Sequence, residues 1–357
     1  MRNKFDIEKI EIKKIDPIKC TKEDWKLYHE FRKIRHEEVN PNDPFTDNET
    51  AEKSLKAARK HPEADISFFS ILDSSKNKQI GQMNYIVIKE KSPSYEGNKH
   101  FVQFDMSILA PYRRRGIGTQ ALKQIYNYAI ENNKSLLVSA SDEEDGKNFL
   151  EIIGAQIALT GVENRLNLEE VDWEMILKWE KEGPERSPET KLRFFYSFPY
   201  DIIEQYSKIY TETLNQQPLG DLDISDIIYT PESLREIEKR RNELGRKHLT
   251  YITVEPDGEI SGLTEMLYRP ERDYIIEQLL TGVRDKYRGR GLGKWLKAVM
   301  LLRVKEEFPN VTIVKTDNAT TNEPMLSIND RLGFKVHKEG ITGQLTVESL
   351  AKYLESK

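Results

Sequence analysis

The sequence predicts an α/β (α+β) protein in which one arrangement of strands and helices occurs twice in tandem. The chain has 357 residues, the length of two ordinary domains. In each half, an apolar and β-prone segment precedes a glycine-rich turn, which precedes apolar residues at helical spacing. The interval from Gly116 to Leu136, in the next predicted strand, equals the interval from Gly291 to Val311 in the second half. This shared register indicates an internal duplication.

The predicted elements follow the same order in both halves. Period-two alternation of apolar residues marks the strands, and helix-capping residues such as Thr21 and Pro231 mark helix starts. The first half is predicted to have strands at 1–20, 66–72, 79–88, 101–109 and 135–139, and helices at 25–38, 49–60 and after 118. The second half is predicted to have strands at 192–198, 250–255, 259–268, 274–283 and 311–315, and helices at 201–215, 231–244, 292–302 and from about 324.

The chain divides into a first domain at 1–165, a linking segment at 166–190 and a second domain at 191–357. The linking segment is predicted to contain a helix at 167–182. The stretch 183–188, Gly-Pro-Glu-Arg-Ser-Pro, is the clearest linker pattern in the chain.

Composition excludes several classes of protein. The formal net charge of −5 argues against a nucleic-acid binder, and the arginine clusters lie in glycine turns, which indicates a small anionic ligand. Cys20 is the single cysteine and the six histidines lack metal-ligand spacing, so we expect neither a disulfide nor a metal site. No apolar stretch is long enough to span a bilayer, and we expect a cytoplasmic protein without a membrane partner. The oligomeric state stays open.

The glycine-rich turn of the second half has the chemistry of a phosphate site. Residues 287–294 have the sequence YRGRGLGK and lie between a predicted strand and a predicted helix. A helix start offers unpaired N–H groups and the positive end of a dipole, and glycine allows the backbone to approach an anion closely. A P-loop would need Ser or Thr after Lys294, where the chain has Trp295, and this also excludes a nucleotide phosphotransferase. A dinucleotide fingerprint would need glycine at Lys294 itself.

Both turns have the form Arg-x-x-Gly-x-Gly, beginning at Arg113 and at Arg288. This motif resembles the acetyl-CoA pyrophosphate loop of the GNAT acyltransferases. The resemblance covers nearly the whole chain, twice, and implies two tandem GNAT domains, each a mixed and mostly antiparallel sheet flanked by helices. The two-domain architecture is similar to that of mycothiol synthase.

The resemblance implies an acetyl-CoA-dependent N-acetyltransferase that acts on a primary amine and needs no metal. The acyl donor could be another acyl-CoA, and the identity of the acceptor, expected to be a small molecule, stays open. The implied cofactor contacts are the strand ends, the loops and the helix starts of both halves, with two asparagines near the last helix. In the second half these are Thr281, Gly282, Val283, Arg288, Gly289, Arg290, Gly291, Leu292, Gly293, Lys294, Asn318 and Asn322; in the first half they are Met106, Ser107, Ile108, Arg113, Arg114, Arg115, Gly116, Ile117, Gly118 and Thr119.

Two glutamates are candidate general bases, which would take a proton from the acceptor amine. Glu277 lies on the predicted strand ahead of the loop arginine, at the distance from it where several GNAT enzymes carry a catalytic glutamate. Glu265 is the second candidate. By sequence spacing, their counterparts in the first half are Val102 and Asn84, which cannot act as bases. The tyrosine that many GNAT enzymes use as the acid is replaced by Asn329.

These differences predict a division of work between the halves. The interval from Leu136 to Gly154 in the first half is about four residues shorter than the interval from Val311 to Gly333 in the second half. The first half therefore lacks about four residues after its fifth strand. We expect the second domain to transfer the acyl group and the first to hold CoA without transfer. The alternative is a catalytically weak acyl-CoA-binding or regulatory protein.

Overall fold

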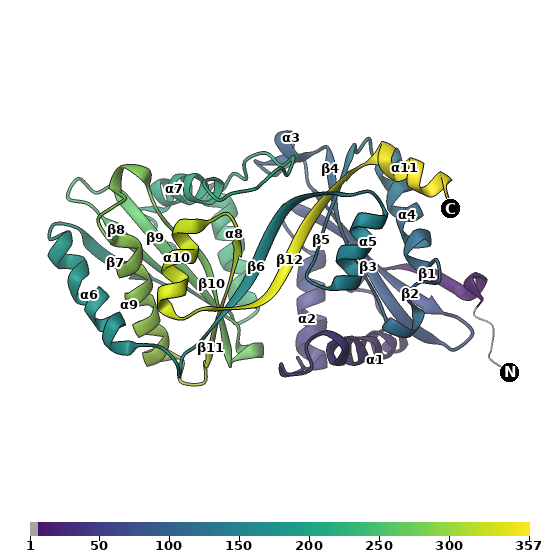
Figure 1. Cartoon of the computed structure of the whole chain (residues 1–357), viewed down its shortest axis with the longest axis horizontal. Helices are drawn as coiled ribbons and strands as arrows, with labels where there is room; N and C mark the ends of the chain where they lie inside the picture. The colour runs from purple at the N-terminus through teal and green to yellow at the C-terminus, as the bar shows by residue number, and fades with distance from the viewer. Residues whose placement is uncertain (1–5) are drawn as a thin grey trace. The chain divides into compact units, whose positions relative to one another are not determined.

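The computed structural model describes residues 6–357, so the start of the strand predicted at 1–20 lies outside the described residues. The N-terminal half contains η1 Ile7–Lys9, β1 Ile10–Ile15, α1 Lys22–Val39, α2 Asn48–Arg59, β2 Ala64–Asp73, β3 Lys78–Ile88, α3 Tyr95–Asn98, β4 Phe101–Ile108, η2 Ala110–Tyr112, α4 Ile117–Glu131, β5 Leu136–Ser141, α5 Glu144–Ile152 and β6 Gln156–Asn167 (Figure 1). The remainder contains α6 Trp173–Arg186, β7 Lys191–Phe195, α7 Ile203–Asn215, α8 Pro231–Glu243, β8 Lys247–Val254, β9 Ile260–Tyr268, η3 Pro270–Arg272, β10 Ile275–Val283, η4 Asp285–Tyr287, α9 Leu292–Glu307, β11 Ile313–Ala319, α10 Glu323–Leu332, β12 Lys335–Thr346 and α11 Val347–Glu355.

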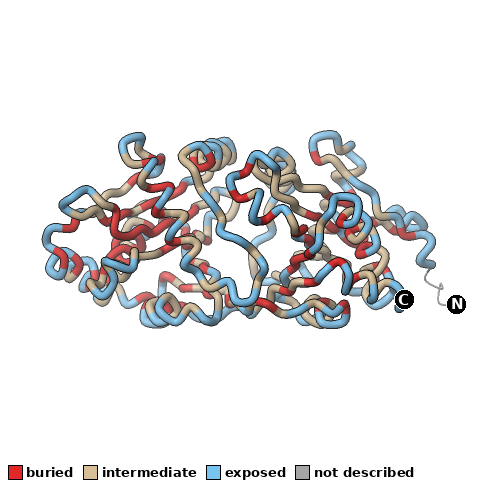
Figure 2. The backbone as a smooth tube through the Cα atoms, turned by 90° about the horizontal axis from the view of Figure 1, so that it is seen from above, coloured by how far each residue is buried: buried red, intermediate tan, exposed pale blue. Residues whose placement is uncertain are grey.

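Backbone contacts divide the chain into two compact units. The first unit comprises the described part of Met1–Ala158 with Leu222–Ser225 and Ile341–Lys357, and the second comprises Leu159–Asp221 and Asp226–Gly340. The C-terminal segment therefore belongs with the first unit, whereas the sequence alone placed it in the second domain. Buried residues concentrate inside each unit, beneath exposed loops (Figure 2).

In the first unit, strands β1 to β5 lie in sequence order. Neighbouring strands are antiparallel except for β4 and β5, which are parallel. The second half of β12, from Ile341 to Thr346, pairs antiparallel with β5 and completes this sheet. Helix α11 adds Val347 and Leu350 to the core formed by α4 and the sheet. The last residues of the chain thus complete the first unit.

In the second unit the strand order is β7-β8-β9-β10-β11, with β10 and β11 parallel and the other neighbours antiparallel. The part of β6 from Gly161 to Asn167 pairs antiparallel with β11. The fold prediction is confirmed: each unit has a mixed, mostly antiparallel sheet flanked by helices. Sequence patterns could not predict that β6 pairs with β11 and β12 with β5, because alternation identifies a strand but not its neighbour.

The linker predicted at 183–188 is wrong for most of its length, because α6 continues to Arg186 with Pro184 inside the helix. Gly183 is needed for packing: a Cβ atom at this position would lie 2.2 Å from the ring of Trp295 on α9. The glycine therefore lets α6 lie against α9 and does not mark a flexible connection.

The predicted four-residue deficit of the first half is also wrong in size. Strand register places Leu136 opposite Phe101 and Ile313 opposite Ile275, so Ile313, and not Val311, is the structural counterpart of Leu136. Measured from these counterparts to the following glycines, Gly154 and Gly333, the first unit is shorter by only two residues. Its helix α5 is present.

Among residues 6–357, the helices are all too short or too polar to cross a membrane. The same residues contain no group of three or more His, Cys, Asp or Glu side chains arranged to hold a metal ion.

Candidate functional site

The two glycine–arginine loops have the same hydrogen bonds. Nε of Arg113 donates to the carbonyl of Ile108 at 2.8 Å, and Nε of Arg288 donates to the carbonyl of Val283 at 3.1 Å. In both cases the arginine lies five residues after the acceptor and closes the turn between strand and helix. Gly116 and Gly291 are the N-cap residues of α4 and α9, both with φ of 83°. The duplication seen in the sequence therefore extends to individual hydrogen bonds.

At one left-handed position of the loop, the first half has an arginine and the second half a glycine. Arg114 has φ of 57°, and its counterpart Gly289 has φ of 82°. This left-handed conformation is easy for glycine and costs other residues about 1–2 kcal/mol. The first loop thus keeps the same backbone shape at an energetic cost.

The second unit has a groove beside its loop, with a volume of about 450 Å³. We call this cavity the second-unit groove. Ten predicted cofactor residues line it: Thr281, Gly282, Val283, Arg288, Gly289, Gly291, Leu292, Gly293, Lys294 and Asn322. Arg288 and Lys294 bring positive charge, and within the described chain no carboxylate lines this groove. The free N–H groups at the start of α9 complete a site suited to an anion.

Arg290 and Asn318, which were predicted to contact the cofactor, are not among the residues that line the groove. The guanidinium of Arg290 pairs with Glu255 at 3.0 Å and also donates to Thr190 and Ser187. It holds the loop onto its own unit instead of facing the groove.

The first unit has a comparable cavity of about 360 Å³, the first-unit groove. Its lining includes eight predicted residues: Met106, Ser107, Ile108, Arg113, Arg114, Gly116, Gly118 and Thr119. Arg115 is absent from the lining, and Ile117 is buried in the core. Tyr353 of α11 also lines the groove, and its hydroxyl lies 3.3 Å from that of Thr119. The C-terminal helix thus contributes to this site.

Arg113 lies among three carboxylates, whereas its counterpart Arg288 pairs with one, Asp285 at 2.8 Å. The guanidinium of Arg113 lies 2.6 Å from Asp145, 3.5 Å from Glu38 and 3.6 Å from Glu143. These acids neutralise much of the positive charge that the loop would offer to a phosphate. The first-unit groove is therefore electrostatically weaker for an anion than the second-unit groove.

In each unit the parallel strands before the loop separate after three paired residues. Strand β4 pairs with β5 from Phe101 to Gln103, and β10 pairs with β11 from Ile275 to Glu277. Beyond these points β4 and β10 have no strand partner on that side among residues 6–357. This separation creates the space in which each groove continues along the strand.

The counterpart of Glu277 is Gln103, so the sequence-based match to Val102 is wrong. Strand β10 carries a β-bulge between Gln278 and Thr281, whereas β4 pairs regularly with β3. One extra residue in β10 shifts every position before the bulge by one relative to the loop. Counting back from the loop arginines could not detect this insertion.

Glu277 lies half-buried on β10, and one carboxylate oxygen accepts a 2.7 Å bond from Arg269. It does not line the second-unit groove. The structure places it at the point where the two strands separate, with the loop residues further along the same strand.

Glu265 is only 1% exposed. It accepts a 2.6 Å hydrogen bond from the hydroxyl of Tyr206 and lies 3.0 Å from Nε2 of His248. Burial lowers the pKa of His248, which favours the neutral imidazole. The bond from Tyr206 lets Glu265 hold α7 against the sheet, and the carboxylate is enclosed by its neighbours.

Asn329, at the position of the expected acid, belongs to a buried polar chain. Its Oδ1 accepts a 2.8 Å bond from Nζ of Lys297, and its Nδ2 donates to Asn318 at 2.9 Å. Burial lowers the pKa of Lys297 to about 7. A tyrosine at this position would leave Lys297 without its partner.

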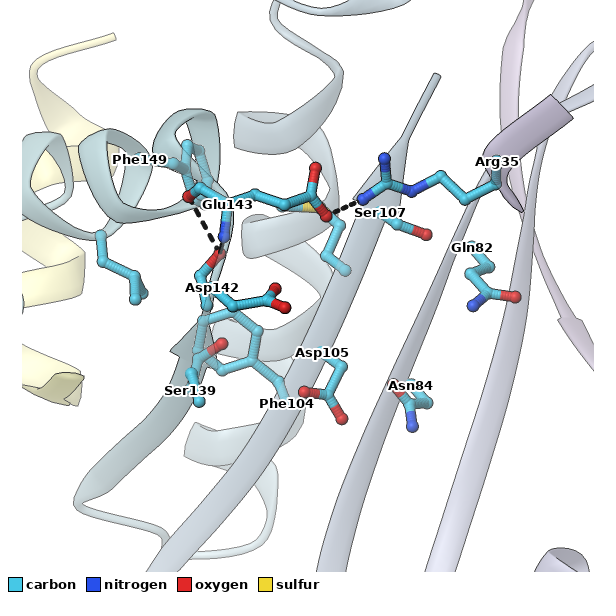
Figure 3. Close-up of a pocket in the computed structure, with 15 residues that line it drawn as sticks. Arg35, Gln82, Asn84, Phe104, Asp105, Ser107, Ser139, Asp142, Glu143 and Phe149 are labelled. Atoms are coloured by element: carbon cyan, nitrogen blue, oxygen red, sulfur yellow. Dashed lines mark hydrogen bonds and ion pairs between the residues drawn. The ribbon is translucent and has the colours of Figure 1, made fainter. Parts of the chain in front are cut away.

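Sequence reasoning missed Asp105 of β4. This residue lines a smaller cavity of about 190 Å³, which we call the first-unit pocket (Figure 3). Asp105 lies opposite Asn84 in the β3–β4 register. Burial raises the pKa of Asp105, and hydrogen bonding with Asn84 lowers it by less. The signal was present in the sequence, because the apolar alternation of 101–109 places Asp105 on the face away from the core.

Comparison with known proteins gives the fold an independent reference. Residues 26–154 match the family described as the acetyltransferase (GNAT) family. A search of curated protein sequences finds no match. The match to a family thus falls on the first half of the chain, the half for which the sequence predicted no chemistry.

Solved structures similar to the whole chain include a tandem GNAT protein from the clavulanic acid biosynthesis pathway, with a TM-score of 0.72, 17% identity, and coverage of 95% of this chain and 98% of that chain. A GCN5-related N-acetyltransferase from Sphaerobacter thermophilus has a TM-score of 0.63 at 12% identity, with coverage of 95% and 96%. N-myristoyltransferase from Saccharomyces cerevisiae has a TM-score of 0.55 at 10% identity, with coverage of 95% and 83%. At these identities the similarity establishes the fold in both halves.

Proposed function

Because residues 26–154 match the GNAT family and the whole chain has the fold of a tandem GNAT protein, we propose that this protein is an acetyl-CoA-dependent N-acetyltransferase acting on a primary amine of a small molecule. The observation that carries the proposal is the repeated loop. In both units an arginine-closed turn presents a helix N-terminus to a groove beside two separating strands. Few other ligands need an anion site and an adjoining channel along a strand.

The residues of the second unit fit a pyrophosphate. The N–H groups of Leu292, Gly293 and Lys294 point from the start of α9, and Gly291 leaves space for close approach of an anion. Arg288 and Lys294 add charge. Acetyl-CoA would supply an activated thioester, and the free edge of β10 would orient it through backbone N–H groups.

Glu277 is the proposed proton acceptor in this unit. It lies where β10 and β11 separate, and its ion pair with Arg269 orients the carboxylate. An acceptor amine entering there would give a proton to Glu277 before its nitrogen attacks the thioester carbon. After the attack the nitrogen would lose its second proton to water, and the thiolate that leaves would take a proton from water, since Asn329 is committed to Lys297.

The experiment is a calorimetric titration of acetyl-CoA into the wild type and four loop variants. Gly291→Asp places a carboxylate beside the pyrophosphate, and Gly291→Asn is the neutral control of the same shape. Both residues tolerate the left-handed conformation, and a Cβ atom at this position meets only ordinary contacts of 3.5 Å. A like charge about 5 Å away costs about 1–3 kcal/mol. We expect Gly291→Asp to bind at least about fivefold more weakly at one site than Gly291→Asn.

Gly116→Asp and Gly116→Asn make the same comparison in the first unit, where a Cβ atom would have its nearest contact at 3.9 Å. Equal affinities within both pairs would refute the cofactor assignment. Transfer is measured as CoA release with a panel of primary amines. Binding without release for any amine would support the alternative, an acyl-CoA-binding or regulatory protein.

A further inference from the structure

We infer that the first unit is itself a transfer centre, with Asp105 as its general base and a small cationic amine as its acceptor. This inference rests on the proposed function and revises the expectation that the first half binds CoA without transfer. It begins from the position of the first-unit pocket. This pocket adjoins the first-unit groove, since Arg35, Met106, Ser107, Ser141, Glu143 and Phe149 line both.

Asp105 lies on the strand that forms the wall of both cavities. Strand β4 loses its β5 partner after Gln103, so Asp105 and Ser107 follow on the free part of the strand. Their side chains alternate onto the same face, and Figure 3 shows Asp105 and Asn84 side by side at one end of the pocket. The hydroxyl of Ser107 is buried and has no hydrogen-bond partner among the described residues. A carboxylate and an available hydroxyl thus lie two residues apart where the groove meets the pocket.

The second unit lacks this connection. The counterpart of Ser107 is Gly282, since each is the second-last residue of its strand. Ser107 pairs with Gln82, the residue after Gly81, and Gly282 pairs with Leu263, the residue after Gly262. A Cβ atom on Gly282 would lie 2.0 Å from Cγ2 of Thr213, so helix α7 is packed directly against this point. A serine like Ser107 therefore has no room at this position of the second unit.

Charge identifies the class of acceptor. Three acidic residues line the pocket, Asp105 from β4 and Asp142 and Glu143 from the β5–α5 connection. Among the described residues, Arg35 of α1 is the only cationic side chain in the lining. Arg35 is itself paired with Glu143 and with Glu38. The lining therefore carries excess negative charge when its carboxylates are ionised, which favours a protonated amine over a neutral or anionic acceptor.

The chemistry balances with this residue as the base. The ammonium group of the acceptor gives one proton to the Asp105 carboxylate, and the neutral nitrogen then forms a bond to the acetyl carbonyl carbon. The carbon–sulfur bond breaks, the nitrogen loses its second proton, and the thiolate takes up one proton. One proton is released overall, through Asp105 to solvent. Desolvation in the pocket raises the pKa of Asp105 above its ordinary value, which makes its carboxylate a stronger base for this transfer.

The test uses the full-length chain and 1,4-diaminobutane as the probe. Calorimetry without acetyl-CoA measures amine binding directly. Asp105→Asn should weaken it on the order of tenfold to a hundredfold, the range for losing a hydrogen bond to a charged group. Asp330→Asn, the same change on the exposed surface of α10, should match the wild type. Equal affinities for wild type and Asp105→Asn would overturn the acceptor assignment.

Turnover is then measured as CoA release in the Gly291→Asp background, in which the second-unit groove binds acetyl-CoA more weakly, at an acetyl-CoA concentration below the Kd of that weakened site. There, Asp105→Asn should lower the rate by on the order of 10²–10⁴, and Asp105→Glu should retain part of it. The pH profile should lose its acidic limb in Asp105→Asn. If Gly291→Asp abolishes transfer while the wild type acetylates the amine, the inference fails and the proposed function stands. If the wild type binds acetyl-CoA but acetylates no amine, the proposed function fails as well.

Discussion

Lys297 should make the stability of the second unit depend on pH in an unusual direction. Its side chain on α9 is 2% exposed and burial lowers its pKa from 10.5 to about 7. Above pH 7 the folded state releases this proton, while the unfolded chain keeps it until about pH 10.5. The unfolded state therefore binds more protons in this window, and stability rises with pH across it. Below pH 7 both states are protonated and the full cost of the buried charge is present.

The magnitude follows from the size of the shift. A change of 10.5 to 7 is about 3.5 pKa units, or about 5 kcal/mol at most, since one unit corresponds to about 1.36 kcal/mol. Integration between pH 7 and pH 9 gives a gain in the free energy of unfolding of about 2 kcal/mol. Lys297→Met removes the titrating group and should remove this gain, although it also leaves Oδ1 of Asn329 without its donor.

The assay is urea unfolding at several pH values, followed by tryptophan fluorescence. Trp173, Trp179 and Trp295 report on the second unit, and Trp25 lies in the first. Other alkaline groups titrate equally in both proteins, so the difference between wild type and Lys297→Met isolates Lys297. A difference that stays constant from pH 7 to pH 9, or that changes in the opposite direction, would refute the reasoning.

Two further variants test the loops and the second-unit base. Arg114→Gly removes the cost of a left-handed arginine and should raise the stability of the first unit by about 0.5–1 kcal/mol, after the larger unfolded-state entropy of glycine is subtracted. Arg115→Gly, at a residue with an ordinary φ, should lower the stability. Thermal unfolding of the two variants tests this difference. In the Asp105→Asn background, Glu277→Gln should lower the remaining CoA release by on the order of 10²–10⁴ while acetyl-CoA affinity is retained, whereas unchanged release would indicate that Glu277 takes no proton.

The sequence by itself determined the tandem fold and both loops. The register of Gly116 and Gly291 survives in three dimensions because strand, turn and helix are local structures, set by hydrophobic period and by glycine conformation. Most predicted loop residues line the two grooves for the same reason. Local signals of this kind need no knowledge of which distant segments meet.

Tertiary structure decided how the two units are completed and where chemistry is feasible. Pairing of β12 with β5, and of β6 with β11, depends on contacts between segments far apart in sequence, which no local pattern encodes. The bulge in β10 moved the counterpart of Glu277 to Gln103, because the extra residue shifts the position of Glu277 relative to the loop by one. Burial enclosed Glu265 and left Asp105 beside an open pocket. Alternation assigns a strand residue to one face of the sheet, but whether that face is covered depends on the helices that pack there, which the sequence could not determine.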